Sequence, residues 1–303
     1  MRDYTVLDAA LCAAKIEYRI DEPMCHHTTF KIGGPADRYI LIENTGALQT
    51  VLKALTASAV PYFVLGNGSN LLVPDEGLRG AVLVLGGEFK KVSLTEDGKI
   101  FCGSGASLAA LCGFARSNAL TGLEFAWGIP GCVGGALYMN AGAYGGEMKQ
   151  VTTRVFYVDE EGRSGVYSGD ALEFGYRHSV FMGTKKIITG AEFELQPGAE
   201  AEITAQMDDL MQRRKSKQPV ELPSAGSVFK RPEGYFAGAL VEQCGLKGCT
   251  VGGACVSEKH AGFIVNTGGA TCKDVESLIG HIQAVVLKET GVTLEPEIRR
   301  ISL

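Results

Sequence analysis

The stretch Gly122–Gly146, GLEFAWGIPGCVGGALYMNAGAYGG, contains eight glycines in 25 residues. Glycine loses more backbone freedom on folding than any other residue, so this density requires a reason. Either the backbone turns repeatedly through positive φ, or a ligand lies against bare backbone. Few polar side chains accompany the glycines, and backbone N–H groups can bind an anion without side chains. From this stretch alone, a set of structural turns and an anion-binding cradle are equally open.

The composition is that of a globular protein. The chain has 303 residues, of which 46% are hydrophobic and 21% charged, enough for two domains with a large core. No apolar run approaches the roughly 20 residues of a membrane span, and the N-terminus lacks a signal-peptide core, so we expect a cytoplasmic protein. The net charge of -5 argues against nucleic acid as the main partner.

The nine cysteines are odd in number and include no CxxC pair. This usage is typical of a reducing compartment, where thiols act as small hydrophobic groups. Cys244, Cys249, Cys255 and His260 could be drawn as a metal set, but their spacings are looser than those of zinc ligand pairs. We therefore expect no metal.

The order of elements predicts an α+β protein with a break near residue 197. Many short strands and few helices precede the break, and a long helix with a basic C-terminal end follows it. The apolar spacing, with Thr45 as the N-cap of the second helix, predicts helices near 5–19, 45–55, 108–118, 201–214, 236–244 and 272–289. It predicts strands near 39–42, 62–65, 81–85, 91–94, 100–103, 151–158, 165–166, 186–195, 251–256, 262–266 and 297–301.

A second glycine-containing loop, GNGSN at 66–70, lies between the predicted strand 62–65 and the apolar residues 71–73. This arrangement is not a Rossmann fingerprint, which needs GxGxxG opening a helix, and the chain has no GxxxxGK[ST] loop. The loop is therefore either a hairpin turn or part of a nucleotide site of another geometry.

Five motifs together carry a family resemblance: YFVLGNGSNLLV at 62–73, GIPGCVGGALYMNAGAYG at 128–145, YRHS at 176–179, LPSAGSVFKRP at 222–232 and LEPEIR at 294–299. In this order they closely resemble the UDP-N-acetylenolpyruvoylglucosamine reductases (UDP-N-acetylmuramate dehydrogenases). The resemblance spans essentially the whole chain. Only about 50 residues separate Arg177 from Ser227, which leaves no room for the insertion of the type I enzymes, so the chain resembles type II.

The resemblance implies an α+β fold in which residues 1–196 form an FAD-binding region of the vanillyl-alcohol-oxidase type. This region would have two subdomains, split near 86, and an α+β substrate-binding domain would follow at 197–303. FAD would be held noncovalently, largely by the backbone of two loops. The matching residues are Gly66, Asn67, Gly68, Ser69, Asn70, Gly128, Ile129, Pro130, Gly131, Gly134, Gly135 and Ala136.

The resemblance also implies the reaction. NADPH would reduce FAD, and the flavin would pass hydride to C3 of the enolpyruvyl ether of UDP-N-acetylglucosamine, giving UDP-N-acetylmuramate for peptidoglycan. Arg177 would stabilise the developing negative charge as a fixed cation. Glu297 would assist by a hydrogen bond, and Ser227 would donate the proton to C2. Without the matched motifs, Arg177 would be interpreted as a surface ion-pair residue, Glu297 as a solvated charge at a strand edge and Ser227 as a turn residue.

Substrate contacts follow from the same motifs. Lys217 and Arg231 fall where the family places groups around the UDP diphosphate, and His260 falls at a position that contacts substrate in some members. We expect no nucleic acid, membrane or obligate protein partner. Two alternatives remain. One is another FAD oxidoreductase of the same fold, with covalent attachment through His26, His27 or Cys132, and the other is a UDP-sugar-binding protein without catalysis.

Overall fold

The computed structural model describes residues 2–303, so Met1 of the predicted 1–196 region lies outside the described residues. The chain divides into two compact units. The first unit contains residues up to 19, 38–67 and 80–212, and the second contains 20–37, 68–79 and 213–303. We describe each unit by itself.

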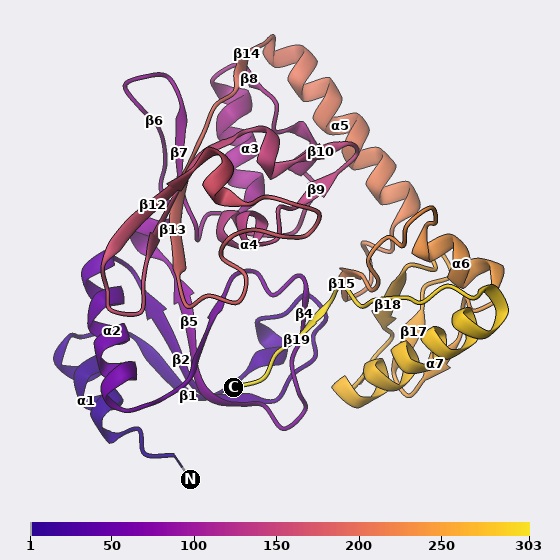
Figure 1. The fold of residues 1–303 in the computed structure, drawn as a ribbon, viewed down its shortest axis with the longest axis horizontal. Coiled ribbons are helices and arrows are strands. Elements are labelled where there is room, and N and C mark those ends of the chain that lie inside the picture. The colour runs from indigo at the N-terminus through magenta and orange to yellow at the C-terminus, as the bar shows by residue number, and fades with distance from the viewer. Residues whose placement is uncertain (1) are drawn as a thin grey trace. The chain divides into compact units, whose positions relative to one another are not determined.

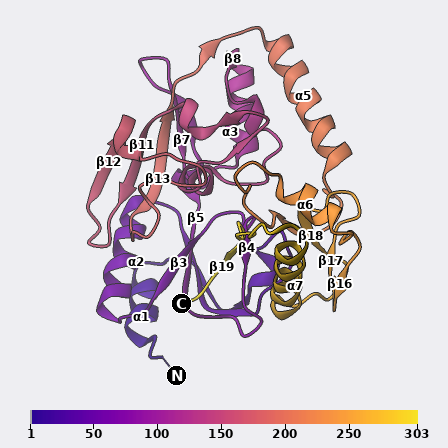
Figure 2. The same ribbon diagram turned by 45° about the vertical axis from the view of Figure 1, so that its right-hand side comes forward.

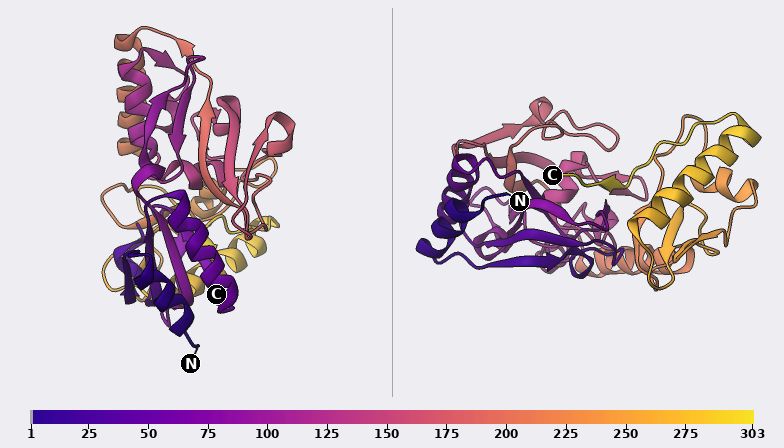
Figure 3. Two further views of the ribbon diagram at one scale, coloured as in Figure 1. Left: turned by 90° about the vertical axis from the view of Figure 1, so that its left-hand side faces the viewer. Right: turned by 90° about the horizontal axis from the view of Figure 1, so that it is seen from below.

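A four-stranded sheet and two helices begin the fold (Figure 1). Its strand order is β1-β2-β5-β3, with β3 and β5 parallel. Side chains from both helices, such as Leu11 and Leu52, share a core with Ile40 and Leu83 of the sheet. The two helices lie together at this sheet in the left-hand view of Figure 3. The elements are α1 (Thr5–Ala13), β1 (Tyr18–Pro23), β2 (Pro35–Ile42), α2 (Thr45–Ala57), β3 (Tyr62–Leu65) and β5 (Leu78–Leu85).

A five-stranded sheet, β12-β11-β13-β7-β6, lies wholly within the first unit (Figure 2). All its pairings are antiparallel. Leu111 of α3 and Leu137 of α4 pack into one core with Val155 and Phe193 of the sheet, which fixes the glycine-rich stretch against the strands. The elements are β6 (Val92–Leu94), β7 (Ile100–Gly103), α3 (Leu108–Ser117), α4 (Val133–Tyr138), β11 (Thr152–Val158), β12 (Ser164–Ser168) and β13 (Ile187–Phe193).

The second unit is built on the antiparallel sheet β15-β18-β17-β16. Helices α6 and α7 cover it, and Phe30, Ile32 and Leu72 from the N-terminal segments enter the same core. A parallel pair joins Leu71–Leu72 to Arg299–Arg300. The elements are β4 (Leu71–Leu72), β15 (Ser224–Ser227), α6 (Ala237–Gln243), β16 (Thr250–Val251), β17 (Ala254–Val256), β18 (Phe263–Asn266), α7 (Cys272–Thr290) and β19 (Arg299–Arg300).

Short elements and one long helix complete the chain. Helix α5 (Glu200–Lys217) buries only Ile203 and Met207, and the division between the units falls within it. The short elements are η1 (Met24–His26), η2 (Gly87–Lys90), β8 (Leu120–Thr121), η3 (Glu124–Ala126), β9 (Gly142–Ala143), β10 (Gly146–Glu147), η4 (Met148–Gln150), η5 (Gly169–Leu172) and β14 (Gln196–Pro197).

The observed elements correct several details of the sequence prediction. The first helix ends at Ala13 rather than 19, because Lys15 adopts a left-handed φ of 54° that no helix continues. The final strand covers only Arg299–Arg300 instead of 297–301. The contiguous domains 1–196 and 197–303 do not coincide with the compact units, because residues 20–37 and 68–79 pack with the C-terminal part of the chain.

Candidate functional site

The GNGSN loop is not a hairpin turn. Strand β3, before the loop, pairs with β5, whereas β4, after it, pairs with β19. Within the first unit, the side-chain amide of Asn67 donates a hydrogen bond to the Pro130 carbonyl at 3.4 Å. A Cβ added to Gly66 would lie only 2.3 Å from the Cys132 sulfur. The two loops that were expected to hold FAD therefore meet, and glycine is required where they meet.

The glycine-rich loop is held by its own hydrogen bonds. The Gly134 amide donates to the Ser104 carbonyl at 2.8 Å, and the Gly131 amide donates to Ile129 at 2.8 Å. The amides of Ile129 and Ala136 also donate to protein carbonyls. An N–H that already has an acceptor cannot serve a pyrophosphate equally well. These four amides are therefore occupied within the protein, and the expectation that the backbone of this loop holds FAD stays a prediction.

One buried polar atom at this loop has no partner. The Ser104 hydroxyl has no hydrogen-bond partner among residues 2–303, and Ser104 is only 3% exposed. It lies beside Gly134, where an added Cβ would be 3.0 Å from the Ser104 Cβ. Buried hydroxyls are normally paired, so an orphaned one indicates a group not yet counted. Bare backbone on two loops and this spare hydroxyl fit a phosphate-bearing cofactor such as FAD.

The rest of the GNGSN loop belongs to the second unit. Gly68 has a φ of +62°, and a Cβ there would lie 2.3 Å from the His27 carbonyl oxygen. The Asn70 side chain donates to the Glu297 carbonyl at 3.3 Å, and the Arg299 amide donates to the Asn70 carbonyl at 3.0 Å. The Asn70 amide therefore holds the C-terminal segment in addition to any role toward FAD.

Ser227 and Glu297 are brought together within the second unit. Ser227 ends β15 and is exposed, and the next residue, Val228, accepts a 2.7 Å hydrogen bond from the Glu297 amide. An antiparallel bridge between Phe229 and Pro296 continues this contact. Two motifs about 70 residues apart in the sequence thus meet through their backbones, next to the expected proton donor and at the expected acid. The Asn70 side chain, which belongs to the GNGSN loop, donates to the Glu297 carbonyl, so this loop contacts the same segment.

Arg177 lies in the first unit, in a tight turn closed by a bridge between Gly175 and His178. Its φ of 53° is in the left-handed region, which is costly for a residue with a side chain. The guanidinium carbon lies 5.2 Å from the Tyr176 ring centroid. The Ser179 hydroxyl donates to the Tyr138 carbonyl at 2.8 Å and fixes the turn to the end of the glycine-rich stretch. A strained, anchored arginine is typical of a functional position.

The three expected substrate residues all belong to the second unit. Lys217 is the last residue of α5 and is exposed. The Arg231 guanidinium carbon lies 4.0 Å from the centroid of the Phe236 ring. His260 accepts the Gly262 amide at its Nδ1, 3.0 Å away, so its neutral ring carries the proton on Nε2. Burial lowers the pKa of His260 below its usual value of 6.5.

Two polar residues at these loops gave no signal in the sequence analysis. Asn140, 1% exposed, donates to the carbonyl of Gly175 in the Arg177 turn at 2.9 Å. Thr29 donates from its hydroxyl to the Ser224 carbonyl at 2.7 Å. Both partners are backbone carbonyls distant in sequence, which no local pattern encodes. Asn140 lies within the matched motif at 128–145 and Thr29 lies in none of the five, and neither was assigned a role from the sequence.

The alternative metal set finds no support. Among residues 2–303, no group of three or more His, Cys, Asp or Glu side chains is arranged to hold a metal ion. All nine cysteines are free thiols, and burial raises the pKa of both Cys102 and Cys112 to about 12. No helix in this range is long and apolar enough to cross a membrane.

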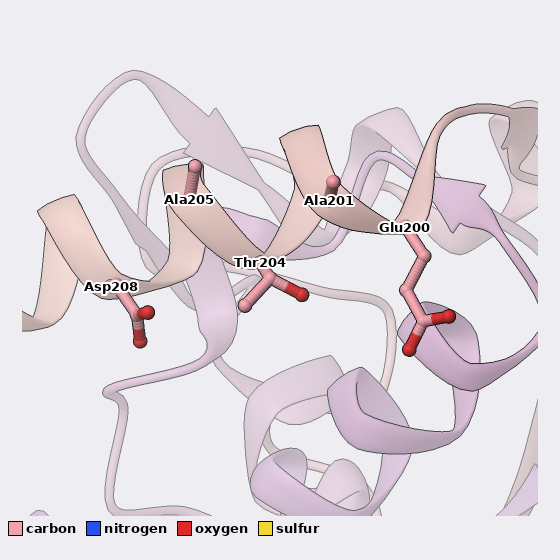
Figure 4. A pocket seen from close by; sticks show the side chains of 5 residues that line it. All are labelled: Glu200, Ala201, Thr204, Ala205 and Asp208. Atoms are coloured by element: carbon pink, nitrogen blue, oxygen red, sulfur yellow. The ribbon is translucent and has the colours of Figure 1, made fainter.

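A surface hollow lies along the first part of α5, and none of the residues that line it is one of those expected in the site. Figure 4 shows Glu200, Thr204 and Asp208 along this helix, with Ala201 and Ala205 beside them. Two carboxylates at the hollow repel a diphosphate, so it does not suit the expected substrate.

Comparisons with known proteins identify the family. A profile described as the C-terminal domain of UDP-N-acetylenolpyruvoylglucosamine reductase matches residues 218–301, and one described as an FAD binding domain matches residues 36–164. A protein with that reductase name from Caldanaerobacter subterraneus is 48% identical over 92% of this chain and 92% of its own length. The chain belongs to the UDP-N-acetylenolpyruvoylglucosamine reductase family.

Other members of the reductase family agree. The reductase from Clostridioides difficile is 46% identical over 94% of both chains. The crystal structure of UDP-N-acetylenolpyruvylglucosamine reductase from Thermus caldophilus is 38% identical, has a TM-score of 0.81 and covers 94% of this chain and 98% of its own. Family membership confirms the predicted α+β fold with an FAD-binding region and the predicted flavoprotein oxidoreductase class.

A more distant likeness concerns the fold alone. Glucooligosaccharide oxidase from Acremonium strictum is 13% identical with a TM-score of 0.50, and covers 96% of this chain and 60% of its own. The FAD of that oxidase is described as linked through cysteinyl and histidyl groups. In this chain Cys132 is 6% exposed, with its sulfur against Gly66.

Proposed function

We propose that this reductase-family chain reduces UDP-N-acetylglucosamine enolpyruvate to UDP-N-acetylmuramate with NADPH as the reductant. The observation that carries the proposal is the 48% identity, over 92% of the chain, to a protein named for this reduction. The product is a precursor of peptidoglycan. Because the reaction draws on NADPH and a UDP-sugar, we place the enzyme in the cytoplasm.

The cofactor would be held by Gly66–Asn70 and Gly128–Ala136 without a covalent bond. When bound, FAD supplies hydride transfer at N5, from NADPH and then to C3 of the enolpyruvyl group. The chain's part is to position the flavin. Gly66 and Gly134 allow close approach of bare backbone, and the Ser104 hydroxyl supplies a hydrogen-bond donor that has no partner among the described residues.

The three catalytic residues would act on the enolpyruvyl group. Hydride addition at C3 builds negative charge at C2 and on the neighbouring carboxylate. Arg177 would stabilise that charge with a planar guanidinium, held in a strained turn. Glu297, if protonated, would donate a hydrogen bond to the same charge, and Ser227 would protonate C2. Their support is the contact of the Ser227 and Glu297 segments through Val228.

The UDP portion would meet residues of the second unit. Lys217 and Arg231 supply cations suited to a diphosphate. The neutral His260 ring would offer Nε2–H as a donor, because Nδ1 is already occupied by the Gly262 amide. The predicted assignment to type II stays a prediction.

The proposal is tested with the purified protein. We expect a noncovalent flavin spectrum, NADPH consumption that depends on the enolpyruvyl substrate, and a product heavier by two hydrogens. Colour that remains with acid-precipitated protein would favour the covalent oxidase alternative. A colourless protein that binds the UDP-sugar without consuming NADPH would favour a binding protein.

A further inference from the structure

Thr29 connects the GNGSN loop to the strand that carries Ser227. Its hydroxyl donates to the Ser224 carbonyl at 2.7 Å, and its backbone amide donates to the Gly68 carbonyl at 3.2 Å. The hydroxyl also lies 3.4 Å from that Gly68 oxygen. Thr29, Gly68 and Ser224 all belong to the second unit, so one residue from the N-terminal region joins two distant motifs.

The strand needs such a support because its regular pairing is interrupted. The pairing of β15 with β18 holds at Ser224 and Ser227, but the register shifts between them. Gly226, inside the irregular part, has a φ of +79° and approaches the Ser69 carbonyl, which would lie 3.9 Å from an added Cβ. A bulged strand can re-aim a side chain, so the position of Ser227 depends on what holds the strand just before it.

We propose that Thr29 is a positioning residue that sets the distance between the cofactor loop and Ser227. This inference rests on the proposed function, because it assigns Thr29 to the step in which Ser227 gives its proton. Thr29 acts through the backbone of Ser224 and touches neither substrate nor the reacting atoms. The Asn70–Glu297 contact holds the acid to the same loop in a comparable way.

Thr29→Val separates the two connections. The valine keeps the shape and the backbone amide that donates to Gly68, but it removes the hydroxyl, which makes the 2.7 Å bond to Ser224 and the longer contact with the Gly68 oxygen. FAD content and flavin reduction by NADPH should therefore stay within about twofold of the unmodified enzyme. Oxidation of the reduced flavin by the enolpyruvyl substrate should slow by roughly tenfold to 10²-fold, because small misplacements of reacting groups cost this much. Thr29→Ser should restore the rate.

Thr28→Val is the matched control. Thr28 is the neighbouring residue, is 2% exposed, and donates from its hydroxyl to the Ile32 carbonyl at 3.0 Å, within its own segment. Thr28→Val removes a hydrogen bond from a threonine hydroxyl to a backbone carbonyl, as Thr29→Val does, without touching β15. The control should lower the thermal midpoint but should not change the ratio of the two half-reactions.

Stopped-flow measurement of both half-reactions tests the inference. The Thr29 variants are made both in the unmodified enzyme and in the Ser227→Ala variant. If Thr29 acts through Ser227, Thr29→Val should have little further effect once Ser227 is alanine. Thr29→Ala replaces the valine variant if that protein does not fold. Wild-type rates in the Thr29 variants, full additivity with Ser227→Ala, or an equal slowing by Thr28→Val would overturn the inference. A wild-type protein that does not reduce the substrate would instead overturn the proposed function.

Discussion

The side-chain amide of Asn140 donates a 2.9 Å hydrogen bond to the backbone carbonyl of Gly175. The same amide donates to Glu147 at 3.1 Å, and the Asn140 oxygen accepts the Lys149 amide at 2.9 Å. Asn140 thus satisfies both ends of its side chain while joining the glycine-rich stretch to the turn of Arg177. The loop expected to hold FAD and the cation expected to stabilise the product's charge are one connected piece of the first unit.

Asn140→Asp should disturb this connection with little change of shape. The aspartate keeps the acceptor for Lys149 but loses the donor to Gly175 and adds a charge beside Glu147. The Gly175 carbonyl keeps its hydrogen bond from the His178 amide, so the variant loses one hydrogen bond, a cost of about 0.5–1.5 kcal/mol, and the thermal midpoint should fall. Turnover should fall further than stability explains, because the Arg177 turn loses one of its two side-chain anchors and keeps only the Ser179 hydroxyl. Thermal unfolding and steady-state kinetics with the enolpyruvyl substrate measure the two effects.

Thr152→Val is the control for Asn140. Its hydroxyl donates to the Met148 carbonyl at 2.8 Å in the same unit, at a residue only 9% exposed. This variant should be destabilised with normal turnover per folded molecule. Equal turnover loss in both variants would show that Asn140 has only a structural role.

Gly66→Ala should reduce FAD loading, and loss of the Cys132 sulfur should relieve the defect. The alanine Cβ would lie 2.3 Å from that sulfur but 3.8 Å from the Cys132 Cβ, which is ordinary contact. The double variant Gly66→Ala/Cys132→Ala should therefore recover FAD affinity. Absorbance at the flavin band, per protein, measures the loading during titration with FAD.

Gly113→Ala provides the comparison for Gly66. This glycine lies in α3, and an added Cβ would meet nothing within 4 Å. Its FAD content should match that of the unmodified protein. Normal loading of the Gly66→Ala single variant would contradict the role of bare backbone where the two loops meet.

The sequence predicted those parts of the fold whose signals are local. Helices α3 and α7 begin at capping side chains, Ser107 and Thr271, that accept hydrogen bonds from amides three residues later. Such caps lie within a window of a few residues, but the one predicted at Thr45 is one residue late, because the Asn44 side chain accepts the Ala47 amide. The pairing of Leu71–Leu72 with Arg299–Arg300 joins segments from opposite ends of the chain, and no local pattern encodes it.

The candidate site likewise contains residues that could be predicted from the sequence and residues that could not. Ser227 and Glu297 could be predicted because they lie in motifs that resemble a family. The residues that hold these motifs, Thr29 and Asn140, could not, because each donates to a backbone carbonyl supplied by folding. Which loop amides are free was also beyond the sequence. The Gly134 amide is occupied by the Ser104 carbonyl, and only the folded chain shows that pairing.

Ser227→Ala should separate the two halves of the reaction. FAD reduction by NADPH should be nearly unchanged, because the proton donor to C2 has no part in it. Oxidation of the reduced flavin by the enolpyruvyl substrate should slow by roughly 10²- to 10⁴-fold, the usual contribution of a positioned acid. Ser224→Ala, three residues earlier in β15, should leave both rates intact. Equal losses in both half-reactions of Ser227→Ala would exclude the proton-donor role.

His260 should make the protein less stable in mild acid. Burial lowers the pKa of the folded His260 ring below 6.5, so the unfolded chain binds a proton that the folded chain resists. Stability is therefore fully present above pH 6.5 and is lost as the pH falls from there through the lower pKa of the folded ring.

His260→Asn keeps an acceptor for the Gly262 amide but cannot titrate, so its stability should vary less over this window. Urea unfolding at several pH values measures the difference, with His281→Asn, at an exposed position of α7, as the control. If His260 also binds substrate through its Nε2–H, the KM of His260→Asn should be higher than that of the unmodified enzyme at pH 7.5. A KM for the asparagine variant equal to that of the unmodified enzyme at pH 7.5 would remove His260 from the substrate site and leave its effect on stability alone.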